Sequence, residues 1–344
     1  MKEVLSQVID GKHLTSETAE RAMELIMAGR ATASQIGSLL TALRMKGETP
    51  EEIAAFARVM RRFAIHVVTE NEQVVDTCGT GGDGADTFNI STAAAIVTAA
   101  AGIPVAKHGN RAMSGKTGSA DVLQALGVSV ELDGERAARC LREVGVCFMF
   151  APQYHQAMKH AVGPRKELGF RTIFNVLGPL ANPAGAKRQV IGTYDASLVD
   201  RMAEALRMLG TTHALIVHGD DGLDEITLST STQIAEIRDG RIQTYTLTPE
   251  HVGIQKHPVE SFRGGDAAFN AQIIRRIFAG EQGAPRDIVV MNAAAAIYVG
   301  GKVNTISDGV RVASAAIDGG HAQAVLERLA KRSHELAGEE RIQV

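Results

Sequence analysis

Two glycine-rich stretches about thirty residues apart most constrain how this chain can fold. They span residues 76–84 and 107–119, and each follows a short apolar run and precedes a segment with helical periodicity. Glycine this dense is too destabilising for the interior of a helix or a strand. Each stretch is therefore expected to be a loop between a strand and a helix, with bare backbone amides that face a ligand.

The pattern around these loops predicts an α/β fold. From about residue 73, short apolar runs alternate with helical segments, which indicates a mostly parallel central sheet flanked by crossover helices. The expected strands lie at 74–75, 103–106, 128–130, 146–150, 190–191 and 214–217, with a hairpin over 234–247 that turns at 239–240. The expected helices lie at 91–101, 119–126, 133–144, 198–209, 267–279, 288–299 and 310–336.

The N-terminal residues are expected to form a small helical bundle. Three helices are predicted, over about 15–28, 32–47 and 49–60, and the third begins with a threonine cap, a proline and a glutamate. Residues 151–187 then interrupt the later alternation with four prolines, so a segment over about 155–185 is expected to return to the bundle. We therefore predict a small helical domain over 1–70 and a larger α/β domain over 71–344.

Composition argues against several classes of protein. A net charge of −3 and 4% aromatic residues disfavour a dedicated nucleic-acid binder. The most apolar run, over 93–103, is far shorter than a membrane span, and the N-terminus lacks the pattern of a signal peptide. Three cysteines without CxxC spacing fit a reducing compartment. We expect a cytoplasmic protein without nucleic-acid or membrane partners.

The first loop formally matches the GxGxxG dinucleotide fingerprint, but its surroundings do not. In that fingerprint an acidic residue ends the next strand, whereas here the next predicted strand ends in Lys107. A nicotinamide cofactor is therefore disfavoured. The following helix begins near Asn89 and Ser91, and the N–H groups and positive partial charge of a helix start suit a phosphate. Plain capping of the helix by these side chains is the alternative.

The second loop is more specific, because three basic side chains lie among its glycines. Lys107 ends a predicted strand, at the edge where open α/β sheets bind ligands, and Arg111 and Lys116 follow. The expected ligand is anionic, and a phosphate ester fits best. The P-loop pattern GxxxxGK[ST] does not occur here, and the alternative is a solvated basic loop.

Adjacent carboxylates follow the strand that is predicted to end near His218. Mg²⁺ prefers oxygen ligands and usually shares its coordination shell with substrate phosphates. Asp224 and Glu225 are preferred over Asp220 and Asp221 because they adjoin the apolar Ile226. The alternative is an acidic surface turn.

Other candidate residues have two open interpretations each. The histidines at 108, 155 and 160 are either acid–base groups or polar lining of a site. Arg165 either holds a carboxylate through a bidentate pair or forms a surface ion pair with Glu167. Cys78 is expected to pack in the core, because no activating base for a thiol nucleophile is evident nearby.

Taken together, these motifs resemble those of the anthranilate phosphoribosyltransferase family. The similarity covers nearly the whole chain, in order, through residues 76–83, 89–92, 107–111, 165–169, 175–180 and 182–183. It implies Mg²⁺-dependent transfer of the phosphoribosyl group of 5-phosphoribosyl 1-pyrophosphate to the amine of anthranilate. The products would be N-(5-phosphoribosyl)anthranilate and pyrophosphate, in L-tryptophan biosynthesis. It also implies a homodimer that forms through the helical domain.

The resemblance further assigns roles to residues. Phosphoribosyl pyrophosphate would be held by Gly79, Gly82, Asp83, Thr87, Asn89, Ile90, Ser91, Thr92, Lys107, His108, Gly109, Asn110, Arg111, Ala112, Met113, Ser114, Gly115 and Ser119. Anthranilate would contact Gly79, His108, Asn110, His155, Arg165 and Gly178. Two Mg²⁺ ions per subunit would be bound through Ser91, Asp224 and Glu225. The chain departs from the family at Tyr154 and Gln156, where a histidine and a proline are common.

Two alternatives of the same fold stay open. A pyrimidine nucleoside phosphorylase carries an extra C-terminal domain, for which this chain looks too short, and an assay of phosphorolysis separates it. A non-catalytic relative that binds nucleic acid would lack the glycine motif that is intact at 79–83. Salt-dependent DNA binding without transferase activity would indicate that second alternative.

Overall fold

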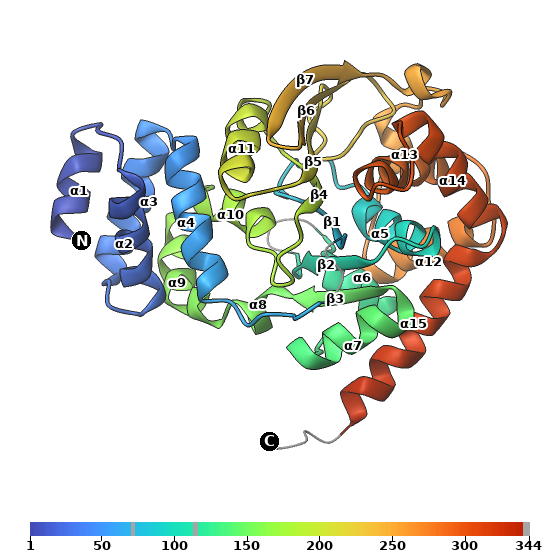
Figure 1. Ribbon diagram of the computed structural model, residues 1–344, viewed down its shortest axis with the longest axis horizontal. Coiled ribbons are helices and arrows are strands. Elements are labelled where there is room, and N and C mark those ends of the chain that lie inside the picture. Colours follow the sequence, from blue (N-terminus) through green and yellow to red (C-terminus); the bar gives the residue numbers. More distant parts are fainter. Residues whose placement is uncertain (70–72, 113–115, 340–344) are drawn as a thin grey trace.

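The computed structural model describes residues 1–69, 73–112 and 116–339. A helical bundle lies at one end of the molecule and an α/β part at the other (Figure 1). Within residues 1–69 the chain forms α1 (Lys2–Ile9), α2 (Ser16–Met27), α3 (Ala33–Lys46) and α4 (Pro50–Arg62). The predicted fold class, a helical bundle followed by an α/β part, is confirmed.

Local sequence signals explain where these helices begin. Thr32 and Gln35 form a capping box at α3, and Thr49 and Glu52 form another at α4, where Pro50 takes the first helical position. Helix α1 was not predicted from the sequence. It is only 8 residues long, and Val4 and Val8 are the residues that it buries. So short a helix depends on packing rather than on intrinsic propensity.

The proline-rich segment packs on this bundle. It forms α8 (Ala151–Tyr154), a 3-10 turn η1 (Gln156–Met158), α9 (Lys159–Leu168) and α10 (Ile173–Leu180). Helix α9 contacts α2 and α3, whereas α10 contacts α3 and α4. Segments that are more than 100 residues apart in the chain therefore lie side by side (Figure 1), and α10 shares one buried apolar cluster with the bundle.

Within the described residues, seven strands form one sheet in the order β3-β2-β1-β4-β5-β6-β7. The parallel strands are β1 (Val75–Gly79), β2 (Val105–Gly109), β3 (Val146–Phe150), β4 (Arg188–Gly192) and β5 (His213–Gly219). The predicted hairpin is confirmed as the antiparallel pair β6 (Thr232–Arg238) and β7 (Arg241–Leu247). The strand order reverses between β1 and β4, which is where open α/β sheets bind ligands.

Helices cover both faces of the sheet. On one face α5 (Ile90–Ala100) packs against α13 (Ala284–Val299), and on the other α11 (Ser197–Met208) joins the sheet to α4 of the bundle. The remaining helices are α6 (Ser119–Ala125), α7 (Gly134–Val144), α12 (Ala267–Phe278), α14 (Ile306–Asp318) and α15 (His321–Gly338), with 3-10 turns η2 (Pro249–Val252) and η3 (Val259–Phe262). Among the helices in the described part of the chain, none combines the length and the apolar character that spanning a bilayer requires.

Two predicted elements differ from the structure. The helix expected over 310–336 is two helices, because Gly320 has a φ of 72°, in the left-handed region, and separates α14 from α15. The strand expected over 128–130 is an irregular segment. The N–H of Val128 donates to the carbonyl of Leu123 and that of Ser129 donates to Ser333 Oγ, so helices rather than a neighbouring strand satisfy this backbone.

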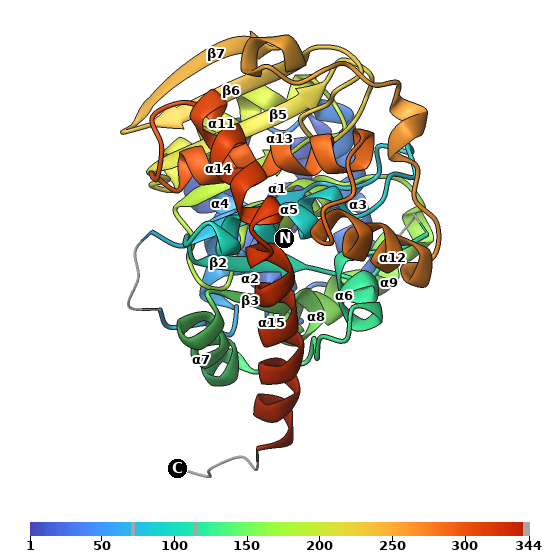
Figure 2. The ribbon, with the colours of Figure 1, turned by 90° about the vertical axis from the view of Figure 1, so that its right-hand side faces the viewer.

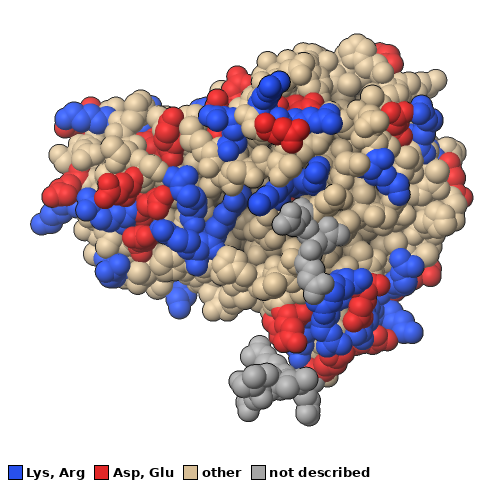
Figure 3. All heavy atoms as spheres, in the orientation of Figure 1, with Lys and Arg blue, Asp and Glu red and all other residues tan. Residues whose placement is uncertain are grey.

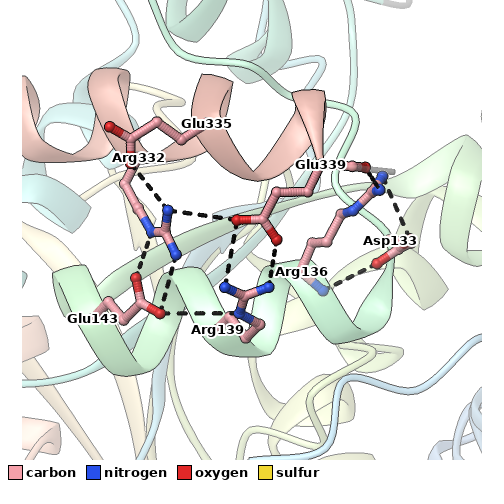
Figure 4. Close-up of polar contacts among 7 residues, drawn as sticks. All are labelled: Asp133, Arg136, Arg139, Glu143, Arg332, Glu335 and Glu339. Carbon is pink, nitrogen blue, oxygen red and sulfur yellow. Dashed lines mark hydrogen bonds and ion pairs between the residues drawn. The ribbon is translucent and has the colours of Figure 1, made fainter. Parts of the chain in front are cut away.

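The C-terminal helix is fastened to α7 by a network of ion pairs. Helix α15 runs along one side of the molecule and passes α7 (Figure 2). Arg332 on α15 pairs with Glu143 on α7, and Arg139 on α7 pairs with Glu339 at 2.5 Å (Figure 4). Because Arg332 also reaches Glu339 at 3.6 Å, these charges form one connected network rather than isolated pairs.

Candidate active site

Four parallel strands of the sheet each end on glycine at the same edge. Gly79 of β1 lies beside Gly192 of β4, where the strand order reverses. A Cβ atom at Gly79 would lie 2.5 Å from Asp224 Oδ2, and one at Gly192 would overlap the backbone carbonyl of Asp224. The glycines therefore allow the segment that carries Asp224 to lie directly against the ends of β1 and β4.

Asp224 and Glu225 are half-buried carboxylates that the protein holds close together. Asp224 Oδ2 accepts a hydrogen bond from the N–H of Gly81 at 2.7 Å, and Glu225 Oε1 accepts one from the N–H of Ser91 at 3.1 Å. Burial and the charge of Asp83 raise the pKa of Asp224 to about 7. Burial and the charge of Asp224 raise the pKa of Glu225 to about 8. A cation at this place would relieve the repulsion between the two carboxylates.

The donor set at this place fits Mg²⁺ in one particular way. In the part of the chain that the structure describes, no group of three or more histidine, cysteine or carboxylate side chains is placed to hold a metal ion. Mg²⁺ commonly takes one or two protein carboxylates and completes its coordination shell with water and substrate phosphates. Asp224 and Glu225 match that arrangement.

Asp220 and Asp221 have different surroundings. Asp221 accepts hydrogen bonds from the hydroxyls of Thr227, at 2.6 Å, and of Ser229. Asp220 accepts hydrogen bonds from Gln233 and Ser231. These two carboxylates therefore shape the turn after β5. Asp224, in contrast, contacts the glycine loop through Gly81.

The start of α5 differs from the predicted capping arrangement. Asn89 precedes the helix, but its side chain makes no capping hydrogen bond. Instead Asn89 Nδ2 donates to the carbonyl of Thr117 at 3.1 Å, and Asn89 Oδ1 accepts from Asn270 Nδ2 at 3.1 Å. Capping by Asn89 is therefore wrong, because its amide joins the first loop to the second loop and to α12. Ile90 and Thr92 are buried in the first turn of α5, and Thr87 forms an isolated bridge with Arg263.

Lys107 lies beneath the two loops and is almost fully buried. Its Nζ donates to the carbonyl of Thr77 at 2.5 Å and to Ser91 Oγ at 3.4 Å. Burial lowers the pKa of Lys107, while the negative charges of Asp76 and Glu225 oppose that shift. Lys107 thus brings a positive charge to the point where β1, β2 and α5 meet.

Asp121 organises the second loop. Its carboxylate accepts hydrogen bonds from the N–H of Ala112 at 3.1 Å and of Gly118 at 3.0 Å, and from Arg111 Nη1 at 2.8 Å. Arg111 also lies over the ring of Phe150, 5.4 Å from its centre. Its guanidinium group is therefore directed at α6 and β3, although the sequence suggested a phosphate ligand.

Other predicted residues of this loop lie nearby, but not all can be placed. Ser119 Oγ donates to the carbonyl of Asn110 at 3.2 Å, and a Cβ at Gly109 would overlap that hydroxyl. Lys116 forms an exposed ion pair with Asp86 at 3.3 Å. The predicted residues Met113, Ser114 and Gly115 lie outside the described residues.

The structure brings His108 and His155 together. Their ring centres are 5.0 Å apart, and within the described chain the Nε2 atom of each has no hydrogen-bond partner. Burial lowers the pKa of His108 to about 3 and that of His155 to about 4, so both rings are neutral near pH 7. His108 is also hydrogen-bonded to the backbone of Gly178. His160 lies elsewhere, against Gly29 of the bundle.

Arg165 and Cys78 are placed as follows. The guanidinium group of Arg165, on α9, lies over the ring of Phe174 at 5.2 Å, and burial lowers its pKa. Burial and the neighbouring Asp76 raise the pKa of the Cys78 thiol well above its usual value. Cys78 therefore remains a neutral thiol, which supports the packing interpretation.

Sequence reasoning missed several residues that shape this edge. Asp76 is fully buried and accepts hydrogen bonds from the N–H of His108 at 3.2 Å and from Asn182 Nδ2 at 2.7 Å. A charged residue inside an apolar strand was a signal that could have found it. Arg171 donates to the carbonyl of Gly82 and lies over the ring of Tyr194. No local sequence pattern predicts the contact with Gly82, because the two residues are 89 positions apart.

Comparisons with known proteins agree with this geometry. A family described as glycosyl transferase family, helical bundle domain, matches residues 2–64, and one described as glycosyl transferase family, a/b domain, matches residues 71–323. The anthranilate phosphoribosyltransferase of Brevibacillus brevis is 55% identical over 325 residues, which cover 94% of this chain and 95% of that relative. This chain belongs to the anthranilate phosphoribosyltransferase family. The resemblance inferred from the sequence motifs is thereby confirmed.

Solved structures of the family share the fold over nearly the whole chain. Anthranilate phosphoribosyltransferase from Thermus thermophilus is 42% identical, with a TM-score of 0.92 over 96% of this chain and 99% of that one. The enzyme from Saccharomyces cerevisiae in complex with PRPP and Mg is 26% identical, with a TM-score of 0.88 over 97% of both chains. Another structure of the yeast enzyme contains 4-fluoroanthranilate, with a TM-score of 0.86 over 97% of this chain and 98% of that one.

Proposed function

We propose that this protein transfers the phosphoribosyl group of phosphoribosyl pyrophosphate to the amine of anthranilate and releases pyrophosphate, in L-tryptophan biosynthesis. The observation that carries the proposal is the edge of the sheet where glycine-ended strands bring Lys107 and two paired carboxylates under two glycine loops. Family membership over 94% of the chain supports it. The yeast relative, which is bound to PRPP and Mg, fits the same interpretation.

The phosphoribosyl pyrophosphate would lie over the carboxyl ends of β1 and β2. Backbone amides and the buried Lys107 there offer positive charge to phosphate groups. The residues that would hold it are Gly79, Gly82, Asp83, Thr87, Asn89, Ile90, Ser91, Thr92, Lys107, His108, Gly109, Asn110, Arg111, Ala112 and Ser119, together with 113–115 of the same loop.

Ser91, Asp224 and Glu225 would hold two Mg²⁺ ions per subunit, together with oxygens of the substrate. Bound Mg²⁺ neutralises the charge that develops on the departing pyrophosphate. The raised pKa values of Asp224 and Glu225 support this assignment, because a neighbouring cation favours the charged form of both groups.

Anthranilate would bind between the glycine loops and α9–α10, in contact with Gly79, His108, Asn110, His155, Arg165 and Gly178. Its aryl amine is neutral at pH 7, so no base is needed to free the lone pair. As the C–N bond to the ribose forms, the C–O bond to pyrophosphate breaks, and the proton on nitrogen is lost afterwards. The unpartnered Nε2 of His108 is the candidate acceptor of that proton.

The domain division and the dimer are parts of the same proposal. Residues 1–70, with a contribution from 155–185, would form the helical domain, and 71–344 the α/β domain. The contacts of α9 with α2 and α3, and of α10 with α3 and α4, support the contribution from 155–185. A homodimer would form through the helical domain, where Ile9 is 69% and Met45 is 83% exposed, although both are large apolar side chains.

The decay of anthranilate fluorescence tests the proposal directly. The protein with Mg²⁺, phosphoribosyl pyrophosphate and anthranilate should consume anthranilate and release equal amounts of pyrophosphate. Omission of either phosphoribosyl pyrophosphate or Mg²⁺ should abolish the signal. Phosphorolysis of a pyrimidine nucleoside without transfer to anthranilate would instead favour the nucleoside phosphorylase alternative.

A further inference from the structure

We propose that Arg171 is a positioning residue, which fixes the glycine loop that binds the pyrophosphate group. This inference rests on the proposed function, because it assigns a role in binding of the same substrate. Arg171 lies in the connection between α9 and α10, whereas the glycine loop follows β1. On the face of the molecule that Figure 3 shows, basic side chains gather where the helical bundle meets the α/β part.

Two contacts hold the guanidinium group of Arg171 in place. One of its N–H groups donates to the carbonyl of Gly82, and its carbon atom Cζ lies over the ring of Tyr194, 4.0 Å from the ring centre. A Cβ at Gly82 would lie only 3.0–3.2 Å from three atoms of the guanidinium group. Arg171 therefore lies directly against the backbone of the loop, and a side chain at position 82 would push it away.

The contact with Gly82 determines where a backbone amide points. Because the peptide unit is planar and trans, its C=O and N–H point in opposite directions. When Arg171 holds the carbonyl of Gly82, the N–H of Asp83 must point away from Arg171. A flip of this peptide rotates the backbone at Gly82 and Asp83, and Gly82 rotates between backbone regions with little steric hindrance. Without Arg171 this peptide can flip and turn its carbonyl oxygen toward a bound phosphate.

The rest of the loop is fixed from other sides. The N–H of Gly81 donates to Asp224 Oδ2 at 2.7 Å, and Thr80 Oγ1 accepts from the N–H of Tyr194 at 3.1 Å. These bonds hold the residues before Gly82, and Arg171 holds the carbonyl of Gly82 itself. Arg171 follows the proposed anthranilate residue Arg165 by six positions, so it joins the segment that carries that residue to the pyrophosphate loop.

Arginine is required here because two geometric features are used at once. A guanidinium group is planar, so it can lie over the ring of Tyr194 while one of its N–H groups donates to Gly82. The ammonium group of lysine carries the same charge but cannot stack in this way. Arg171→Lys thus keeps the charge and removes the fixed orientation, whereas Arg171→Ala removes both.

Steady-state kinetics with both substrates test the proposal. For Arg171→Ala we expect KM for phosphoribosyl pyrophosphate to rise about tenfold, with kcat and KM for anthranilate within about twofold of wild type. Because Arg171 is exposed, Tm should stay within about 2 °C. Arg171→Lys should reverse less than half of this rise in KM for phosphoribosyl pyrophosphate. Arg275→Ala is the matched control, since it removes an exposed arginine that donates to the carbonyl of Ala125 at 2.9 Å, and it should change neither KM.

Tyr194→Leu separates positioning from direct contact with the phosphates. If Arg171 acts through Gly82, loss of the ring that orients it should raise the same KM severalfold. An unchanged KM in Tyr194→Leu, together with near-complete rescue by Arg171→Lys, would show that the charge acts directly on the substrate and would overturn the proposal. So would an unchanged KM in Arg171→Ala. A wild-type protein without transferase activity would refute the proposed function itself. An active wild type whose variants keep an unchanged KM would refute only the role of Arg171.

Discussion

Asp224 and Glu225 are held where burial and the charges of neighbouring carboxylates oppose their ionisation. We expect Asp224→Asn to lower kcat/KM at least about 100-fold, because a carboxylate that neutralises the metal is lost. The Mg²⁺ concentration for half-maximal rate should rise. The free energy of unfolding of the metal-free protein should not fall, since a repulsive charge is removed. Initial rates across a Mg²⁺ titration and urea unfolding measure both effects.

The matched control for this prediction is Asp220→Asn. Asp220 follows the same strand, but its carboxylate is hydrogen-bonded to Ser231 and Gln233. We expect this variant to keep the Mg²⁺ dependence of wild type. If Asp224→Asn also kept it, Asp224 would have no role in holding the metal.

Because His155 is buried, we expect the free energy of unfolding to depend on pH. The pKa of His155 is about 4 in the folded protein and about 6.5 in the unfolded chain. The unfolded state therefore binds more protons below pH 6.5, and the histidine contributes stability that is present above pH 6.5 and lost as pH falls toward 4. Each unit between the two pKa values corresponds to about 1.4 kcal/mol, so a loss of about 2 kcal/mol between pH 6.5 and pH 5 is expected.

A comparison with His155→Gln tests this effect, because titrating groups far from His155 contribute equally in both proteins. The difference in unfolding free energy between wild type and His155→Gln should shift against the wild type as pH falls from 7 to 5. Urea unfolding at several pH values measures it. His334→Gln, at an exposed histidine, is the control and should give a difference from wild type that does not depend on pH. The same pH-independent result for His155→Gln would contradict the pKa assigned to His155.

Single residues also show what a sequence can and cannot reveal. Lys107 was predicted to bind an anion because it ends a predicted strand, at the edge where open α/β sheets bind ligands, and the structure places it under both loops. Capping of α5 by Asn89 or Ser91 was one interpretation of the sequence, but the side chain of Asn89 contacts Thr117 and Asn270, which come from distant parts of the chain. Local patterns encode backbone geometry, whereas such contacts depend on the tertiary fold.

At the scale of elements, prediction succeeded where the pattern was strong and local. The hairpin turn at Asp239 and Gly240 was found because both residues tolerate positive φ, which is 50° and 77° in the structure. The break at Gly319 and Gly320 was missed, although two adjacent glycines are a signal that a helix ends. The valines at 128 and 130 suggested a strand, but they are buried against helices, and burial alone does not distinguish a strand from a loop.

The network between α7 and α15 gives a prediction at the element scale (Figure 4). Arg332→Ala removes the side chain that pairs with Glu143, Glu335 and Glu339. We expect Tm to fall by about 2 °C at low salt and by less at 1 M salt, because exposed charges are screened. Lys331→Ala is the control, since the one ion pair that Lys331 forms within the described residues, with Glu335, is at 4.0 Å. Equal effects of the two variants would mean that the network adds no stability.

At the scale of the whole molecule, the bundle is joined to the sheet on one side and exposed on the other. Helix α11 shares buried residues with both the sheet and α4, so the bundle is anchored through its inner surface. On its outer surface α1 and α3 contact each other and leave Ile9 and Met45 exposed. Isolated exposed apolar residues are common, but two on contacting helices are consistent with an interface.

Light scattering coupled to gel filtration tests that interface. We expect the wild type to elute with twice the 36.5 kDa mass of one chain, and Met45→Glu to elute as a monomer at about 10 µM. A charged side chain at the centre of an apolar contact has to be desolvated without a partner, which destabilises the dimer. Phe269→Glu, on α12 of the α/β part, alters a side chain that is 48% exposed and should leave the dimer intact. A wild type that is monomeric at that concentration, or a Met45→Glu variant that remains dimeric, would exclude this surface as the interface.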